Sequence, residues 1–240
     1  MKISLIIPAY NEEKYIGACL EAAIKNSHGA FHEIIVVDNA STDKTAEIAG
    51  KFPGVKVVKE SRKGLTRARQ RGLKEATGDF LAYIDADTKM PEGWAEKAEK
   101  IFSKNSNIVS VSGPYRYYDS AFMNIIMRSI WAVSAPIMYR ITGYMILGGN
   151  FIAKKDALLR AGGFNENVEF YGEDTDIAKT LSRQGKLVFR MDFYMPTSSR
   201  RLQAEGVIRT NIRYAVNFIW EVIFHRPYHT KDYKDIRHDN

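Results

Sequence analysis

Short apolar runs alternate with amphipathic segments along the first half of the chain. Apolar runs of about four to eight residues predict buried strands, and one-sided apolar stripes at helical spacing predict helices that cover a sheet. The predicted strands are residues 3–7, 33–38, 55–58, 80–85 and 108–112, and the predicted helices between them are 13–28, 44–51, 65–76 and 93–102. Strands that alternate with helices in this way indicate an α/β fold with a doubly wound, parallel sheet.

The second half continues the alternation less regularly. Strands are predicted at 148–153 and 187–191, and helices at 155–161 and 173–184. No repeat and no linker rich in proline or serine divides the sequence. We therefore expect one domain over residues 1–200, followed by a C-terminal segment, 201–240.

Residues 121–147 form an unusually apolar stretch. Its part 130–147 carries a single charge, Arg140, and is long enough to be considered for a membrane span. A single crossing would put Asp87 and the later acids on opposite sides of a bilayer, with Pro136 and Arg140 near its centre. We expect this stretch to pack beside the functional site or to dip into a membrane surface.

A last helix is predicted over residues 204–225, and it is amphipathic. One face carries Ile208, Ile212, Ala215, Ile219, Val222 and Ile223, and the opposite face carries Arg209, Arg213, Asn217 and Glu221. Such a helix either docks on its own domain or lies in a membrane interface. The end of the sequence is polar.

The composition narrows the partners. The chain of 240 residues is 45% hydrophobic and carries a net charge of +7, which favours anionic partners such as nucleotides, phosphates and anionic lipid. Nucleic acid is disfavoured because the basic residues are spread without an interleaved aromatic platform. The single cysteine, Cys19, fits a reducing compartment, and residues 3–7 are too short for a signal peptide core. We expect a cytoplasmic protein, placed at the inner face of a membrane where its apolar segments attach.

The apolar run 80–84 stops at two carboxylates, Asp85 and Asp87. In open α/β sheets ligands bind beyond the carboxyl ends of the strands. Residues two apart point the same way, so both carboxylates could reach one hard cation such as Mg²⁺ or Mn²⁺. The alternative is a solvated turn before the next helix.

The ordered motifs, and not any one of them, resemble the family 2 glycosyltransferases, which are inverting enzymes with the GT-A fold. The motifs are residues 6–13, 35–45, 63–69, 85–87, 148–150 and 173–174, within a match that covers roughly residues 1–190. The resemblance implies a mostly parallel GT-A sheet flanked by helices over 1–200, with a nucleotide-binding half (about 1–112) and an acceptor half (about 113–200).

The resemblance also implies roles for individual residues. Asp87 would bind the metal directly, Asp85 would hold the ribose or bind the metal through water, and Asp174 would be the general base. The implied donor-binding residues are Pro8, Ala9, Tyr10, Glu12, Asp38, Lys63, Gly64, Arg69, Asp85, Ala86 and Asp87, and the implied sugar or acceptor contacts are Gly148, Gly149, Asn150 and Glu173. The cation would be Mn²⁺ or Mg²⁺, since negative charge develops on the departing diphosphate. Glu12 reads equally well as an acid in the first turn of a helix, and Asp176 is left without a role.

Some positions depart from the family pattern. Lys89 stands where members that load polyprenyl phosphates can carry a glutamine that joins the metal, and the signature of processive synthases is absent. A single-transfer enzyme is therefore favoured, and the leading hypothesis for its donor is a UDP- or GDP-hexose. Residues 198–201 occupy a loop where many members carry histidine. Arg200 and Arg201 would either grip the diphosphate or form a basic surface turn.

The sequence leaves alternatives open for the acceptor and for the class of reaction. A lipid-linked acceptor is favoured by the apolar stretches, 121–147 and 204–225, together with the positive charge, and a soluble glycan or protein is the alternative. Nucleotidyl transfer onto a sugar phosphate shares this architecture, but it normally needs a basic, glycine-rich loop after the first strand. Residues 8–13 are acidic instead.

Overall fold

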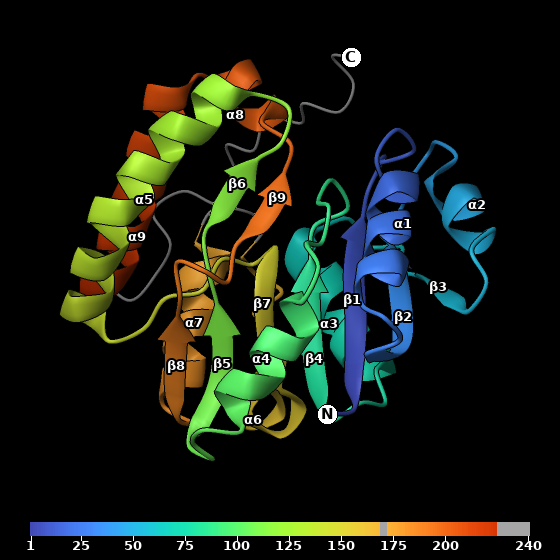
Figure 1. Ribbon diagram of the computed structural model, residues 1–240, viewed down its shortest axis with the longest axis horizontal. Helices are drawn as coiled ribbons and strands as arrows, with labels where there is room; N and C mark the ends of the chain where they lie inside the picture. Colours follow the sequence, from blue (N-terminus) through green and yellow to red (C-terminus); the bar gives the residue numbers. More distant parts are fainter. Residues whose placement is uncertain (169–171, 225–240) are drawn as a thin grey trace.

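The computed structural model describes residues 1–168 and 172–224, and a seven-stranded sheet runs through the centre of this described part (Figure 1). The strand order is β3-β2-β1-β4-β7-β5-β8. The strands are β1 (Ile3–Ala9), β2 (Phe31–Asp38), β3 (Val55–Lys59), β4 (Phe80–Ile84), β5 (Ile108–Ser112), β7 (Asn150–Lys154) and β8 (Lys186–Phe189). Each of them overlaps a strand predicted from the sequence.

Helices cover both faces of this sheet, which confirms the doubly wound α/β prediction. One face packs against α1 (Ile16–Asn26), α2 (Thr45–Gly50) and α4 (Trp94–Phe102), and the other against α3 (Leu65–Glu75), α6 (Lys155–Arg160) and α7 (Glu173–Ser182). In β1, Leu5 and Ile7 belong to the first core and Ile6 to the second, and all three side chains are completely buried. A strand buried on both faces has a continuous apolar sequence, and this is why it was predictable.

The order of the strands reverses next to β1. The chain moves outward from β1 through β2 to β3, and then returns to pair β4 with the other edge of β1. Both pairings of β1 are parallel, so the carboxyl ends of β1, β2 and β4 lie at one edge of the sheet. A crevice at such a reversal is where ligands bind in open α/β sheets.

The strand β7 is the exception to the parallel prediction, because it pairs antiparallel with both β4 and β5. The chain leaves β5 at its carboxyl end and makes a long excursion beyond that edge of the sheet. It enters β7 from the same end, so β7 has to run in the opposite direction.

A second, smaller sheet and the helices beyond it are built from this excursion together with the chain after β8 (Figure 1). Strands β6 (Tyr115–Tyr117) and β9 (Met195–Thr197) pair in parallel and lead to α5 (Ala121–Thr142), α8 (Arg200–Glu205) and α9 (Val207–Phe224). The hydropathy pattern missed β6 and β9, which have three residues each. The predicted helix 204–225 is corrected to two helices that are separated at Gly206, whose φ is 84°. Its predicted end, His225, lies outside the described residues.

Helices α5 and α9 expose much of their apolar surface. On α5, Met127 and Ala135 are buried, and the outward residues are Phe122, Ile125, Val133, Ile137 and Ile141. On α9, Thr210 and Asn217 are buried, and Ile208, Ile212, Val216 and Ile219 are exposed. Asn217, which the sequence places on the face opposite the apolar residues, is therefore on the side that packs against the domain. Helix α9 docks on its domain through a face with polar residues, and most of its apolar face stays uncovered.

Helix α5 is also long and apolar enough to cross a membrane. It has 22 residues, a mean hydropathy of 1.3, and only 11% of its apolar window is buried; it alone passes this test within residues 1–168 and 172–224. Length and composition by themselves are weak evidence for a span.

Candidate active site

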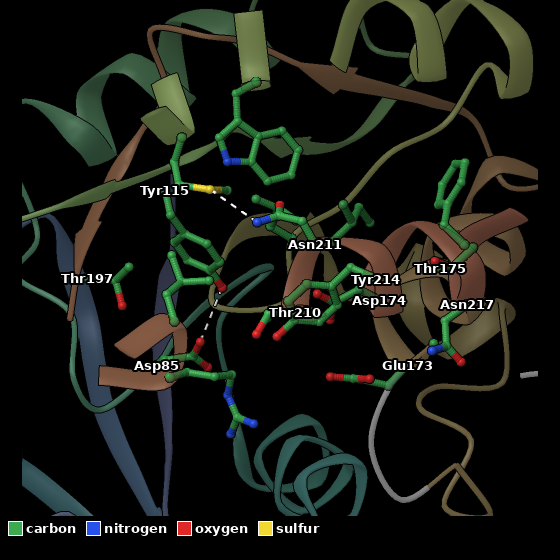
Figure 2. A pocket seen from close by; sticks show the side chains of 18 of the residues that line it. Asp85, Tyr115, Glu173, Asp174, Thr175, Thr197, Thr210, Asn211, Tyr214 and Asn217 are labelled. Atoms are coloured by element: carbon green, nitrogen blue, oxygen red, sulfur yellow. Dashed lines mark hydrogen bonds between the residues drawn. The ribbon is translucent and has the colours of Figure 1, made fainter. Parts of the chain in front are cut away.

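The end of β4 and the start of α7 face one cavity of about 530 Å³ (Figure 2). Asp85 and Asp87 follow β4 directly, and Glu173 and Asp174 begin α7. All four acids line the cavity, so the structure brings together the predicted metal-binding acids and the predicted base. The remaining wall is largely apolar and comes from α5 and α9, including Met127, Trp131 and Phe218 among others.

The carboxylate of Asp85 is held by Tyr115 of β6. The Tyr115 hydroxyl donates to Asp85 Oδ2 at 3.2 Å and accepts from the backbone N–H of Gly149 at 2.9 Å. A Cβ on Gly149 would collide with the Asp85 carboxylate, so the backbone can approach this closely only because the residue is glycine. Desolvation in the cavity raises the pKa of Asp85; Arg69 opposes this shift, and Asp87 and Asp174 add to it.

Asp174 is fixed from two directions. Its Oδ2 accepts from the backbone N–H of Gly148 at 2.8 Å, and its Oδ1 lies 3.1 Å from Nη1 of Arg69. A Cβ on Gly148 would collide with the Asp174 carboxylate and the Arg69 guanidinium. Both glycines of the predicted loop therefore act through their backbone, and they position the two acids that flank the cavity.

Arg69 lies among the acids of the site. Its side chain is 2% exposed, and its guanidinium lies 3.1 Å from Asp174, 3.7 Å from Asp85 and 4.0 Å from Glu173. Burial alone would lower the pKa of Arg69, but the three carboxylates together raise it. Its predicted contact with the nucleotide stays a prediction, and what the structure adds is a link between Asp85 and Asp174.

Glu173 is the most deeply buried acid of the four. Its side chain is 9% exposed. Burial and the neighbouring Asp174 raise its pKa to about 7, and Arg69 opposes the shift. Near neutral pH this side chain can therefore hold or release a proton beside the predicted base.

Asp87 is bound by the C-terminal segment of the described chain. Thr197 Oγ1 lies 3.3 Å from Asp87 Oδ1, and Arg200 Nε lies 3.0 Å from Asp87 Oδ2. The same guanidinium contacts Glu12 Oε1 at 2.6 Å and lies over the ring of Tyr15. The interpretation of Arg200 as part of a basic surface turn was wrong, because its side chain is only 14% exposed and reaches into the site.

The predicted nucleoside contacts lie around the carboxyl ends of β1 and β2. Pro8 and Ala86 line the cavity, and Ala9 is the last residue of β1. Lys63 Nζ lies 3.9 Å from the centre of the Tyr10 ring. Tyr10, Asp38 and Lys63 are not among the residues that line the 530 Å³ cavity, and their roles stay predictions.

Two residues near this end have clear local functions. Asp38 is 6% exposed, and its Oδ1 accepts from the backbone N–H of Ser41 at 3.2 Å, which closes a turn after β2. Gly64 precedes α3 with φ of 149°, a conformation that favours glycine, and its N–H donates to Asn39 Oδ1 at 2.8 Å.

Asn150 does not reach the cavity. Its side chain is completely buried, its amide donates to the carbonyls of Gly113 and Phe193, and its Oδ1 accepts from Trp94 Nε1. The predicted contact with sugar or acceptor is therefore replaced by a structural role: Asn150 ties β7 to the loops behind the site.

Sequence reasoning missed several residues of the site. Tyr115 and Thr197 lie on the short strands β6 and β9, and Met127 and Trp131 lie in the apolar stretch that was considered only as a packing or membrane element. Within the described residues no three His, Cys, Asp or Glu side chains converge as a ready-made metal site. Asp85 and Asp87 could therefore supply two ligands, and the others would have to come from elsewhere.

Comparisons with known proteins agree with this arrangement. A mannosyltransferase from Pyrobaculum calidifontis, solved with GDP-Man and Mn²⁺, superposes with a TM-score of 0.70 at 22% identity and covers 99% of this chain and 68% of the other. S. aureus TarS superposes with a TM-score of 0.67 at 21% identity, over 92% of this chain and 72% of the other. These neighbours have the GT-A fold, which confirms the predicted fold class.

Sequence relatives point the same way. A dolichol-phosphate mannosyltransferase from Pyrococcus furiosus is 37% identical over 113 residues, which is 45% of this chain and 32% of the relative. The chain thus spans about a third of the length of that relative. The sequence profile described as "Glycosyl transferase family 2" matches residues 4–160. The chain therefore belongs to glycosyl transferase family 2.

Proposed function

We propose that this glycosyltransferase moves a hexose from a nucleoside diphosphate sugar to an acceptor hydroxyl or phosphate, with inversion at the anomeric carbon. The observation that carries the proposal is the shared cavity: Asp85 and Asp87 line it from the end of β4, and Asp174 lines it from the start of α7. A leaving diphosphate and an incoming nucleophile need such groups on two sides of one sugar ring.

The residues present fit a divalent cation. Asp85 and Asp87 offer carboxylate oxygens, which suit Mg²⁺ or Mn²⁺. The raised pKa of Asp85 reflects loss of water and an excess of nearby negative charge, both of which a cation would offset. When bound, the ion would stabilise the negative charge that develops on the departing diphosphate. The neighbours solved with Mn²⁺ or Mg²⁺ support this choice of metal.

Asp174 is the proposed general base. Gly148 and Arg69 fix its carboxylate at the cavity, so the proton of an acceptor hydroxyl would pass to an oxygen that is already oriented. Glu173 lies beside it with a pKa raised by burial, and we assign it to contacts with the sugar or acceptor.

The two substrates would bind to successive parts of the chain. Residues 1–112 would bind the nucleotide, with Pro8, Tyr10 and Asp38 at the nucleoside, and residues 113–200 would bind the acceptor. The nucleoside of the donor would be uridine or guanosine, since neighbours were solved with UDP-GlcNAc or GDP-Man.

We assign a lipid-linked acceptor to the apolar side of the cavity. Met127, Trp131 and Phe218 would contact an apolar part of the acceptor. The outward faces of α5 and α9 are apolar, and the exposed arginines beside them are Arg128, Arg140 and Arg209. Exposed apolar surface with flanking basic residues is typical of peripheral contact with an anionic membrane. The relative that is named a dolichol-phosphate mannosyltransferase supports this acceptor class, and the enzyme would work at the cytoplasmic face of a membrane.

A pair of variants tests the two acids. We would screen UDP- and GDP-hexoses with Mn²⁺ by thermal shift, since ligands that bind the folded state raise its apparent stability. Asp87→Ala should lose the metal-dependent shift. Asp174→Asn should keep the shift and lose turnover by about 10²-fold or more. Normal turnover by Asp174→Asn would remove the proposed base, and release of pyrophosphate from a nucleoside triphosphate would favour nucleotidyl transfer instead.

Flotation with anionic vesicles tests the membrane contact. Ile137 on α5 is 53% exposed, and Leu159 on α6, a helix that packs on the main sheet, is 57% exposed. Ile137→Glu should lower the fraction of protein that floats with the vesicles, whereas Leu159→Glu should not. Wild-type protein that stays entirely in the aqueous fraction would contradict the membrane proposal.

A further inference from the structure

Arg200 joins two acids from the first half of the chain, Glu12 and Asp87. Its Nη2 lies 2.6 Å from Glu12 Oε1, and its Nε lies 3.0 Å from Asp87 Oδ2. The exposed fractions of the three side chains are 14% for Arg200, 4% for Glu12 and 14% for Asp87. Ion pairs so well shielded from water are screened far less than surface pairs. They also keep a defined geometry, because the guanidinium is a planar fork that contacts both carboxylates at once.

Both oxygens of Asp87 have partners from the segment 197–200. Thr197 lies at Oδ1 and Arg200 at Oδ2. The contact with Thr197 is a hydroxyl contact at 3.3 Å and is weaker than the contact with the guanidinium. A divalent ion that binds Asp87 needs an oxygen lone pair and approaches a site where Arg200 already places a positive charge. The cation and the guanidinium therefore compete for the same carboxylate.

We propose that Arg200 is an internal counter-cation that competes with the divalent ion for Asp87, and that the diphosphate of the donor relieves this competition by taking over Arg200. The proposal rests on the proposed function, in which Asp87 holds the ion. A guanidinium that leaves Asp87 needs another anion, and a nucleoside diphosphate brings one beside the metal. Ion and nucleotide then bind cooperatively, and each raises the affinity for the other by the same factor.

This coupling would also select the order of events. The ion alone would bind weakly, because it would have to separate Arg200 from Asp87 without giving the guanidinium a new partner. With the nucleotide present both positive groups have anions. Asp87 would thus bind the divalent ion firmly only when the donor is also bound.

The test measures binding of Mn²⁺ from MnCl₂ by the electron paramagnetic resonance signal of free Mn²⁺, with and without UDP or GDP. Arg200→Gln should bind Mn²⁺ alone about tenfold more tightly than the wild type. The wild type should gain about tenfold or more in Mn²⁺ affinity when the nucleotide is added, and Arg200→Gln should lose most of this gain. No catalytic turnover is needed for either measurement.

Arg160→Gln is the control for the loss of one arginine charge, since Arg160 lies on α6 outside the cavity lining, where it pairs with Asp156 at 2.8 Å. It should leave both values unchanged. If Arg200→Gln does not fold, Arg200→Met removes the same charge with an unbranched apolar side chain, and its Mn²⁺ affinity should rise by a similar factor.

Three results separate the hypotheses. Mn²⁺ affinity that is unchanged or weaker in folded Arg200→Gln or Arg200→Met would overturn the competition. Wild-type affinity for Mn²⁺ in Asp87→Asn would show that Asp87 is not the ligand, and both this inference and the metal assignment above would fall. Tighter Mn²⁺ binding by Arg200→Gln in a protein that transfers no hexose would uphold the competition and refute the proposed reaction alone.

Discussion

The hydroxyl oxygen of Tyr115 connects Asp85 with the backbone of Gly149, so a variant without this atom tests both contacts at once. In Tyr115→Phe the ring remains, but the hydroxyl no longer donates to Asp85 or accepts from Gly149. Every other side chain can stay where it is. The effect therefore measures the two hydrogen bonds instead of a change in packing.

The two lost contacts have different costs. The side chain of Asp85 is 36% exposed, so water from the cavity can replace the hydroxyl at its carboxylate. The backbone N–H of Gly149 is in a buried residue, and leaving such a donor without a partner costs about 1–3 kcal/mol. We expect the free energy of unfolding to fall by about 2 kcal/mol, and the midpoint of thermal unfolding to fall by roughly 4–8 °C.

Urea unfolding followed by tryptophan fluorescence gives the free energy, and Tyr117→Phe is the matched control. Tyr117 lies on the same strand and lines the same cavity, but no hydrogen bond of its hydroxyl to a described residue is found. The control should stay within about 0.5 kcal/mol of the wild type. Equal stability of the two variants would refute the claim that Tyr115 holds the Gly149 loop against Asp85.

Two further predictions concern the acids at the start of α7, Asp174 and Glu173. Gly148→Ala should destabilise the fold by about 1–3 kcal/mol and reduce turnover, since the added Cβ collides with Asp174 and Arg69. Gly50→Ala is the control, because nothing lies within 4 Å of the added Cβ, and it should be neutral or stabilising. The urea midpoints of the two variants test this prediction. The raised pKa of Glu173 stabilises the fold below its unfolded value of 4.5, and this contribution disappears as the pH rises through about 7. Relative to wild type, Glu173→Gln should therefore gain up to about 3 kcal/mol of stability between pH 4.5 and 7.5, and parallel pH profiles would contradict the shift.

The main sheet could be predicted because its strands are buried on both faces. Residues such as Leu5, Ile6 and Ile7 alternate between two cores, so the pattern is a continuous apolar run in each strand. The direction of β7 could not be predicted in this way. Its direction is set by the end of the sheet from which the excursion through α5 returns. An apolar run in the sequence does not indicate in which direction its strand will lie in the sheet.

The candidate site was predictable where acids follow strands and was not where distant segments meet. Asp85 and Asp87 are local features of β4. Their partners are not, since Arg200 is 113 residues from Asp87 in the sequence, and Arg69 is 105 residues from Asp174. Asn150 shows the opposite error: a residue in a motif was interpreted as a ligand contact, although its amide is used up by the backbone behind the loop.

The pairing of arginines with acids also accounts for the charge of the cavity. Glu12, Asp85, Asp87, Glu173 and Asp174 line it, and so do the three guanidinium groups of Arg69, Arg200 and Arg201. Even with Glu173 protonated, the carboxylates outnumber these cations, although the chain as a whole carries +7. A diphosphate brought into such a cavity on its own would meet net repulsion. The negative surplus therefore supports the proposal that the donor binds together with a divalent cation, and that Arg200 then exchanges its carboxylate partners for the diphosphate.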